Sequence, residues 1–259
     1  MHIDFEEQAK GNSLLHRLDA RVKIVCAAAV VVGVVFFSHW QTALLVLVAC
    51  LGLAAYSRAS MRIYLKRLIY PSYIIIFVSA IQPFMYGKTV VATVPALGLP
   101  IYQEGVSFAI LIFTRCLSAV AVLNLLILVT PLTALLDSLA WFRIPAAITD
   151  TMMLMFRYVS IISEESARMH KAQESRCGYS RRLSFLRKVR NYGTIAGMLL
   201  VRAFDRALKV GDAMASRAYT GKYRIFTYQK RDMRARDLIL GLLIVLAITA
   251  LVLADIFVL

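Results

Sequence analysis

The sequence lacks the residue patterns by which many enzymes bind nucleotides, metals or acyl groups. Its 259 residues contain no G-x-x-x-x-G-K-[ST] loop, no H-E-x-x-H pair and no G-x-S-x-G turn, which excludes the hydrolases that depend on these motifs. The four histidines are scattered, and the four cysteines share no metal-type or redox-type spacing. We therefore expect no cofactor, no metal site and no catalytic residues in this chain.

Acidic residues are scarce, and charged residues of either sign are few. The chain has 15 acidic residues against 30 basic ones, yet only 17% of its residues are charged and 60% are hydrophobic. With a mean hydropathy of +0.70, this composition is typical of an integral membrane protein. A basic balance can indicate nucleic acid, but here the basic residues border apolar segments, where anionic lipid headgroups attract them. We expect a lipid bilayer as a partner, and no nucleic acid.

Long apolar runs predict five membrane crossings, with six as the alternative. Basic residues lie before the first run and after the second, so both of these flanks, and the amino terminus, are expected in the cytoplasm. Pro71 and Pro83 are expected to kink or end the third span, and residues 87–104 to form an external loop. The expected spans are 22–38, 41–57, 68–86, 105–130 and 237–258.

The stretch 131–236 begins and ends on the cytoplasmic side in this topology, so it crosses the membrane an even number of times. Residues 132–143 predict a short amphipathic helix, and residues 145–163 are apolar enough to span. The apolar run 194–204 is too short for a hydrocarbon core of about 30 Å. We expect that neither apolar segment crosses fully and that both lie near the inner interface. The chain then divides into residues 1–130, 131–236 and 237–259.

Two charged residues, Asp150 and Arg157, stand within the apolar part of this stretch. They are seven residues apart, hence on one helix face, and could pair through a third group. We expect them to stabilise a packed helix, although a charge at membrane depth is also a functional hint.

A strongly basic segment, residues 164–236, holds 18 of the 30 basic residues against six acidic ones. Such a segment resists translocation and is expected in the cytoplasm. It contains a short repeat: one Ser-Arg tripeptide is followed 41 residues later by another. These tripeptides are Ser175-Arg176-Cys177 and Ser216-Arg217-Ala218. They suggest a surface that docks two similar partners; the alternative is that both arginines are ordinary helix-end charges near lipid headgroups.

Two helices are expected in this basic segment, Glu164–Gly178, ended by glycine, and Asp205–Ala218. Each arginine would then lie at a helix C-terminus, where cations are favoured. In the second helix Ala207, Gly211 and Ala215 recur every fourth position, which favours a buried face and a close crossing of the two helices.

Taken together, these features resemble the transmembrane (T) component of energy-coupling factor transporters, in particular the cobalt-type CbiQ family. The resemblance extends over nearly the whole chain and starts with Gly11-Asn12-Ser13 and the segment 15–23. It continues through Thr130-Pro131, Phe142-Arg143-Ile144-Pro145, Phe156-Arg157-Tyr158 and the segments 172–176 and 212–219. The family carries two short motifs centred on arginine, usually Ala-Arg-Gly or Ala-Arg-Ser. Here the arginines are kept and their neighbours differ.

The resemblance implies an all-α integral membrane protein with about five transmembrane helices and a cytoplasmic helical coupling domain, in the cell (inner) membrane of a bacterium or archaeon. It implies a scaffold subunit of an importer, not an enzyme. Two ATP-binding (A) subunits would each receive one arginine-tipped helix and hydrolyse ATP. The expected coupling residues are Ser175, Arg176, Cys177, Ser216, Arg217 and Ala218.

The resemblance also implies a substrate-binding membrane (S) subunit, similar to CbiM, with or without a small accessory membrane subunit. That subunit would reorient and release its substrate inward. Cobalt is the expected substrate; nickel or a vitamin, or a stand-alone secondary transporter, are the alternatives.

Overall fold

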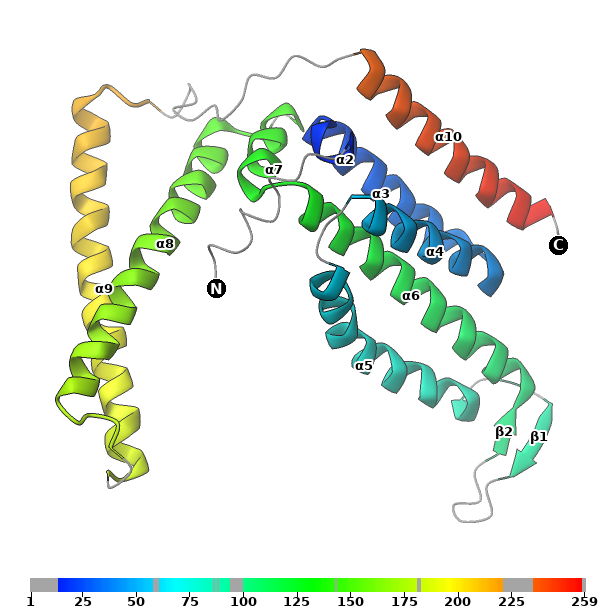
Figure 1. Ribbon diagram of the computed structural model, residues 1–259, viewed down its shortest axis with the longest axis horizontal. Coiled ribbons are helices and arrows are strands. Elements are labelled where there is room, and N and C mark those ends of the chain that lie inside the picture. Colours follow the sequence, from blue (N-terminus) through cyan, green and yellow to red (C-terminus); the bar gives the residue numbers. More distant parts are fainter. Residues whose placement is uncertain are drawn as a thin grey trace. The chain divides into compact units, whose positions relative to one another are not determined.

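The residues that the structure describes are almost entirely helical (Figure 1), and the chain divides into two compact units. Unit 1 comprises Met1–Ser138 together with Gln229–Leu259, and unit 2 comprises Leu139–Tyr228. The first and last of the three parts expected from the sequence therefore belong to one unit. The computed structural model describes residues 14–57, 61–85, 87, 89–93, 100–142, 144–180, 183–220 and 235–257.

Unit 1 is a helical bundle in which α6 packs against α3, α4 and α5, and α10 packs against α3. Three of its helices, α5, α6 and α10, are long and apolar enough to cross a membrane, and α4 is a shorter apolar helix. The helices are α2 (Leu14–Arg17), α3 (Ala20–Phe36), α4 (Trp40–Tyr56), α5 (Met61–Met85), α6 (Gln103–Val129), α7 (Leu132–Leu139) and α10 (Ala235–Phe257). The expected all-α integral membrane protein is confirmed. Five crossings stay a prediction, because α3 and α4, at 17 residues each, are near the lower limit for a span.

The prolines and the external loop of unit 1 can be compared with the expectation. Helix α5 continues past Pro71 and ends at Met85, two residues after Pro83. Proline is tolerated inside a membrane helix where neighbouring groups satisfy the carbonyl oxygen that it leaves free. The segment between α5 and α6 contains a small antiparallel ribbon. Its strands are β1 (Val90–Thr93) and β2 (Pro100–Tyr102).

Polar side chains inside the bundle bond to backbone carbonyls of neighbouring helices. The hydroxyl of the fully buried Tyr64 donates to the carbonyl oxygen of Ala121 at 3.1 Å, and the Asn124 amide donates to that of Tyr64 at 3.2 Å. The Ser118 hydroxyl donates to the carbonyl oxygen of Ala43 at 2.7 Å. Each bond satisfies a polar group that lipid could not satisfy and also fixes the position of two helices.

Helices α3 and α10 approach closely at two glycines. A methyl group built on Gly33 would lie 2.5 Å from Cγ2 of Ile248, and one built on Gly241 would lie 2.6 Å from Cγ1 of Val22. The thiol of Cys26 also donates to the carbonyl oxygen of Gly241 at 3.7 Å. The contact between the two ends of the chain therefore requires the absence of side chains at these positions.

The carboxyl-terminal part of α10 also holds the turn between α3 and α4. Asp255, which is 3% exposed, accepts hydrogen bonds from the backbone N–H groups of Ser38 and His39. Its other carboxylate oxygen is 3.2 Å from Nδ1 of His39. Asp255 thus satisfies the backbone N–H groups of the two residues that precede α4 and fixes the turn from another helix.

The described residues of unit 2 form a short 3-10 helix (Ala140–Phe142) and two long helices that run in opposite directions (Figure 1). They are α8 (Ala146–Ser175) and α9 (Phe185–Ser216). The segment 145–163 and most of the expected helix Glu164–Gly178 thus form one helix, α8. The apolar run 194–204 and most of the expected helix Asp205–Ala218 form the other, α9. Neither α8 nor α9 is among the helices apolar enough to cross a membrane; their position at the inner interface stays a prediction.

Substitution of the two contact glycines should loosen the bundle. Gly33→Ala and Gly241→Ala should each lower the free energy of unfolding by about 1 to 2 kcal/mol, because the neighbouring branched side chains must move. Gly52→Ala in α4 is the matched control: nothing lies within 4 Å of its added methyl group, and alanine favours a helix, so stability should stay equal or rise. Thermal unfolding of the purified chain in detergent measures all three. An equal response of the three variants would contradict the close contact.

Candidate functional site

The first Ser-Arg element forms the end of α8. Arg176 is the C-cap residue, and Cys177 after it has a left-handed backbone with φ 55°. The N–H of Gly178 donates to the carbonyl oxygen of Gln173 at 2.8 Å, and the N–H of Cys177 donates to that of Glu174 at 2.9 Å. This pair of bonds is the Schellman motif, which satisfies the last carbonyls of a helix.

The second element forms the end of α9 in the same way. Arg217 is the C-cap residue, and Ala218 has φ 55°. The N–H of Tyr219 donates to the carbonyl oxygen of Met214 at 3.1 Å, and the N–H of Ala218 donates to that of Ala215 at 3.0 Å. The short repeat in the sequence is therefore also a repeat in structure.

The residues next to the two arginines also match. The hydroxyl of Ser175 donates to the carbonyl oxygen of Ala172 at 2.9 Å, and that of Ser216 donates to the carbonyl oxygen of Ala213 at 3.0 Å. Both arginines are exposed. Each serine thus closes its own last turn, and each guanidinium can bind a carboxylate or a carbonyl of another molecule.

Glycine does not take the role expected for it at the first end. The left-handed position belongs to Cys177, where an L side chain costs about 1 to 2 kcal/mol. Gly178 serves close packing instead: a methyl group there would lie 2.9 Å from the carbonyl oxygen of Gln173 and 3.1 Å from Nδ2 of Asn191. The helix therefore stops through its backbone bonds, and Gly178 lets α9 approach.

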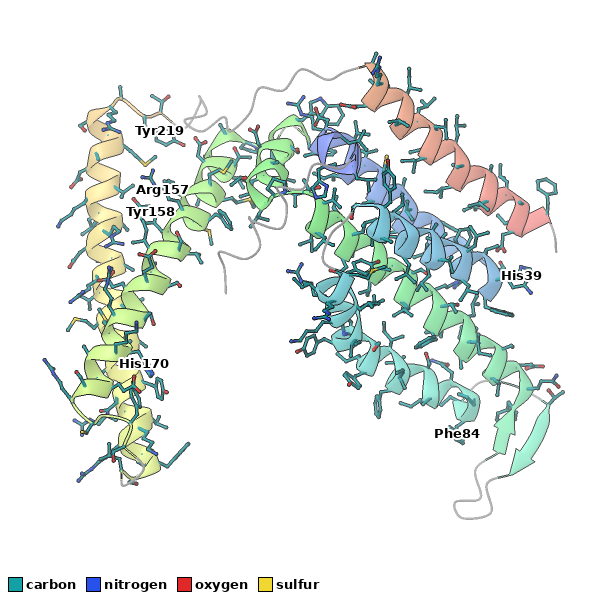
Figure 2. All side chains as sticks on the ribbon, in the orientation of Figure 1. His39, Phe84, Arg157, Tyr158, His170 and Tyr219 are labelled. Carbon is teal, nitrogen blue, oxygen red and sulfur yellow. The ribbon has the colours of Figure 1, made fainter. Side chains whose placement is uncertain are left out.

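Several contacts fix the first arginine end to the beginning of α9. The Asn191 amide donates to the carbonyl oxygen of Gly178 at 2.7 Å. Three aromatic rings stack beside it: Tyr179 lies 4.5 Å from His170 and 4.7 Å from Tyr192, measured between ring centroids. Figure 2 places His170 at this end of the helix pair. Arg176 therefore projects from a rigid base.

One tyrosine connects the second arginine end to the beginning of α8. The Tyr219 hydroxyl donates to Oδ2 of Asp150 at 3.0 Å, and Asp150 is only 2% exposed. Removal of the Tyr219 hydroxyl from water, together with this carboxylate, raises the pKa of Tyr219. The sequence suggested that Asp150 could pair with Arg157 through a third group on the same helix face, which stays a prediction; the structure shows a hydrogen bond to Asp150 from the chain after α9.

An ion pair joins the two helices between these ends. Oε1 of Glu165 lies 2.6 Å from Nη1 of Arg202, and Oε2 lies 3.5 Å from Nη2 of Arg206. The Glu165 side chain is 12% exposed. The hydrogen bond from Arg202 holds the pKa of the Glu165 carboxyl below its ordinary value. The sequence analysis missed these three residues.

The small residues that were expected to form the contact between the two helices do not lie at that contact. Ala207, Gly211 and Ala215 are exposed, and nothing lies within 4 Å of a methyl group built on Gly211. At about 100° per residue, they occupy the side of α9 opposite to Arg202 and Arg206, which contact α8. The spacing of small residues identifies a face of α9 without large side chains. The face of α9 that packs against α8 is instead the one that carries the ion pair.

The two arginines lie far apart. The Gly178–Asn191 bond places Arg176 near the start of α9, and Arg217 follows its end. At about 1.5 Å per residue, the intervening part of α9 separates them by roughly 40 Å.

A family model described as CbiQ, cobalt transport protein, matches residues 11–228, which include both arginine elements. The chain belongs to this family. The confirmed family agrees with the resemblance on which the expected site residues depend, and with a multi-pass membrane protein.

Three relatives of this CbiQ-family chain cover it to different extents. The cobalt transport protein CbiQ of Rhodobacter capsulatus is 34% identical over 117 residues, 45% of this chain and 46% of that protein. The putative fused cobalt transport protein CbiMQ of Methanocorpusculum labreanum is 31% identical over 126 residues, 49% of this chain and 20% of that protein. The energy-coupling factor transporter transmembrane protein EcfT of Streptococcus equi subsp. equi is 30% identical over 239 residues, 87% of this chain and 88% of that protein.

Glycine in the left-handed positions should stabilise unit 2. Cys177→Gly and Ala218→Gly should each raise the free energy of unfolding by about 1 kcal/mol, because glycine adopts this conformation without steric cost. Ala207→Gly, on the exposed side of α9, is the control and should lower it by about 1 kcal/mol. Chemical denaturation of the purified chain compares the variants; a loss of stability in both cap variants would contradict the left-handed caps.

The Glu165 ion pair should make the stability of unit 2 depend on pH. Because the pKa of Glu165 in the folded chain is below its ordinary value of 4.5, its contribution is present above that value and is lost as the pH falls through the lowered pKa. Glu165→Gln should therefore lose stability less steeply than the wild type between about pH 5 and about pH 3. Glu164→Gln, the exposed neighbour, should keep the wild-type profile. Circular dichroism of thermal unfolding at stepped pH tests both.

Proposed function

We propose that this chain is the transmembrane scaffold subunit of an importer of the energy-coupling factor type. In this proposal two ATPase subunits bind in the cytoplasm, one at Arg176 and one at Arg217. Unit 2 passes their motion to unit 1, on which a substrate-binding membrane subunit reorients. The chain itself has no catalytic role, and its amino terminus lies in the cytoplasm.

The observation that carries the proposal is the pair of equivalent, exposed arginine ends. Both have the same backbone bonds, the same serine contact and the same left-handed residue, so two copies of one partner surface, or two similar surfaces, can bind them. A guanidinium makes planar, bidentate bonds to carboxylates, which suits recognition of a groove on a partner. The separation of roughly 40 Å allows both partners to bind at once.

The relatives support the other partners. The EcfT name describes a transmembrane protein of an energy-coupling factor transporter, and the fused CbiMQ protein joins CbiM to a CbiQ part in one chain. We infer that a CbiM-like membrane subunit binds this chain as well. The description of the family as a cobalt transport protein favours cobalt as the substrate.

Charge reversal at the two arginines tests the docking proposal. Arg176→Glu and Arg217→Glu should each weaken binding of the ATPase subunits roughly a hundredfold, the effect of opposing the carboxylates of a buried charge pair, and the double variant should abolish cobalt uptake. Lys209→Glu makes the same change of sign at an exposed residue in the body of α9 and should bind normally. Copurification from mild detergent and uptake of radioactive cobalt into cells are the measurements.

A double variant that retains its ATPases and transports cobalt at the wild-type rate would contradict the proposal. Uptake of nickel or of a vitamin in place of cobalt would contradict the proposed substrate but not the proposed docking of the ATPase subunits at Arg176 and Arg217.

A further inference from the structure

The two arginine ends differ in how they are held. At the Arg176 end, Asn191 and the aromatic rings around Tyr179 join the residues after α8 to the beginning of α9. At the Arg217 end the described chain after α9 is residues 217–220, and the Tyr219 hydroxyl donates a hydrogen bond to Asp150 of α8. Figure 2 shows Tyr219 at the opposite end of the helix pair from His170.

The backbone between Arg217 and Tyr219 is fixed. The N–H of Ala218 and the N–H of Tyr219 are both bonded to the last turn of α9, and Ala218 is held in the left-handed region. A displacement of Arg217 therefore moves the Tyr219 ring with it. The arginine and the tyrosine behave as one rigid element.

Asp150 is placed where the chain enters unit 2. It is the fifth residue of α8, which begins at Ala146, and unit 2 begins at Leu139. The residue is 2% exposed, so loss of a hydrogen-bond donor to its carboxylate would leave part of a buried charge uncompensated. The bond is therefore directional and costly to break, which suits a contact that transmits displacement.

We propose that the hydrogen bond between Tyr219 and Asp150 is the positioning contact that passes the motion of the Arg217 end to the start of α8, and through the chain to unit 1. This inference rests on the proposed function. Motion of the Arg176 end has to travel along roughly 40 Å of helix to reach the same point. The two ATPase positions are thus unequal in effect even when the two ATPases are identical.

The test uses the complete transporter, with its ATPase and membrane partners, purified and reconstituted in liposomes. Tyr219→Phe removes only the hydroxyl. ATPase copurification and ATP hydrolysis should stay within about twofold of the wild type, while cobalt taken up per ATP hydrolysed should fall roughly tenfold, the factor that corresponds to one charge-assisted hydrogen bond. This loss of coupling at constant assembly is a readout that a general loss of folding does not produce.

A second variant tests whether the two residues act as a pair. Asp150→Asn keeps an acceptor oxygen for the Tyr219 hydroxyl but removes the charge, so it should lower uptake per ATP. The double variant with Tyr219→Phe should be no worse than Tyr219→Phe alone, because both changes act on the same bond. Matched controls are Tyr73→Phe, at an exposed tyrosine of α5, and Asp205→Asn, at an exposed carboxylate of α9. Both should keep the wild-type ratio.

Three results would overturn the positioning contact: an unchanged ratio in both single variants, additive losses in the double variant, or a loss of ATPase copurification that accounts for the whole loss of uptake. The proposed function fails in a different way, when the wild-type chain itself retains no ATPase subunit. The two failures are therefore distinguishable in one set of preparations.

Discussion

The ion pair between Glu165 and Arg202 determines the arrangement of unit 2. Two helices of 30 and 32 residues meet along a limited surface, and a short contact between a carboxylate and a guanidinium fixes both the meeting point and the faces that meet. Once this point is set, helix geometry fixes the rest. Asn191 reaches the turn on one side of it, and the end of α9 reaches Asp150 on the other.

This arrangement explains why so short a motif can occur twice in different surroundings. At both arginines the geometry comes from two backbone hydrogen bonds and one left-handed residue, which do not depend on the neighbouring side chains. The surroundings are free to differ, and they do: rings and an amide at one end, a phenol and a buried carboxylate at the other. Backbone hydrogen bonds thus give the two arginine-bearing helix ends the same local geometry, while the contacts that hold each end to the other helix differ.

The sequence alone was sufficient for features that depend on local pattern. Apolar runs located the helices of unit 1, and the excess of Lys and Arg located the basic insert with its two Ser-Arg elements. Features that depend on distant residues were not accessible. The partner of Asp150 is 69 positions away, and the choice between the small-residue face of α9 and the face with Arg202 depends on a glutamate of another helix. Arg202 and Arg206, spaced by four residues on one face of an amphipathic helix, were the available signal.

The left-handed residues show a similar limit. Glycine near the end of a helix usually marks the stop, yet Cys177 takes that conformation one residue before Gly178, because the bonds to Gln173 and Glu174 decide the register. Gly178 is needed instead because Asn191, 13 residues further along the chain, packs closely against it. The glycine in the sequence indicated where α8 ends, but the backbone hydrogen bonds and the packing against α9 determine which residue takes the left-handed conformation.

The contact between α10 and α3 has a consequence for biosynthesis. Unit 2 is inserted in the sequence between two parts of one bundle. The surface around Gly33 therefore meets its counterpart only after the ribosome has synthesised both unit 2 and α10. Until then the nascent bundle is open on that side.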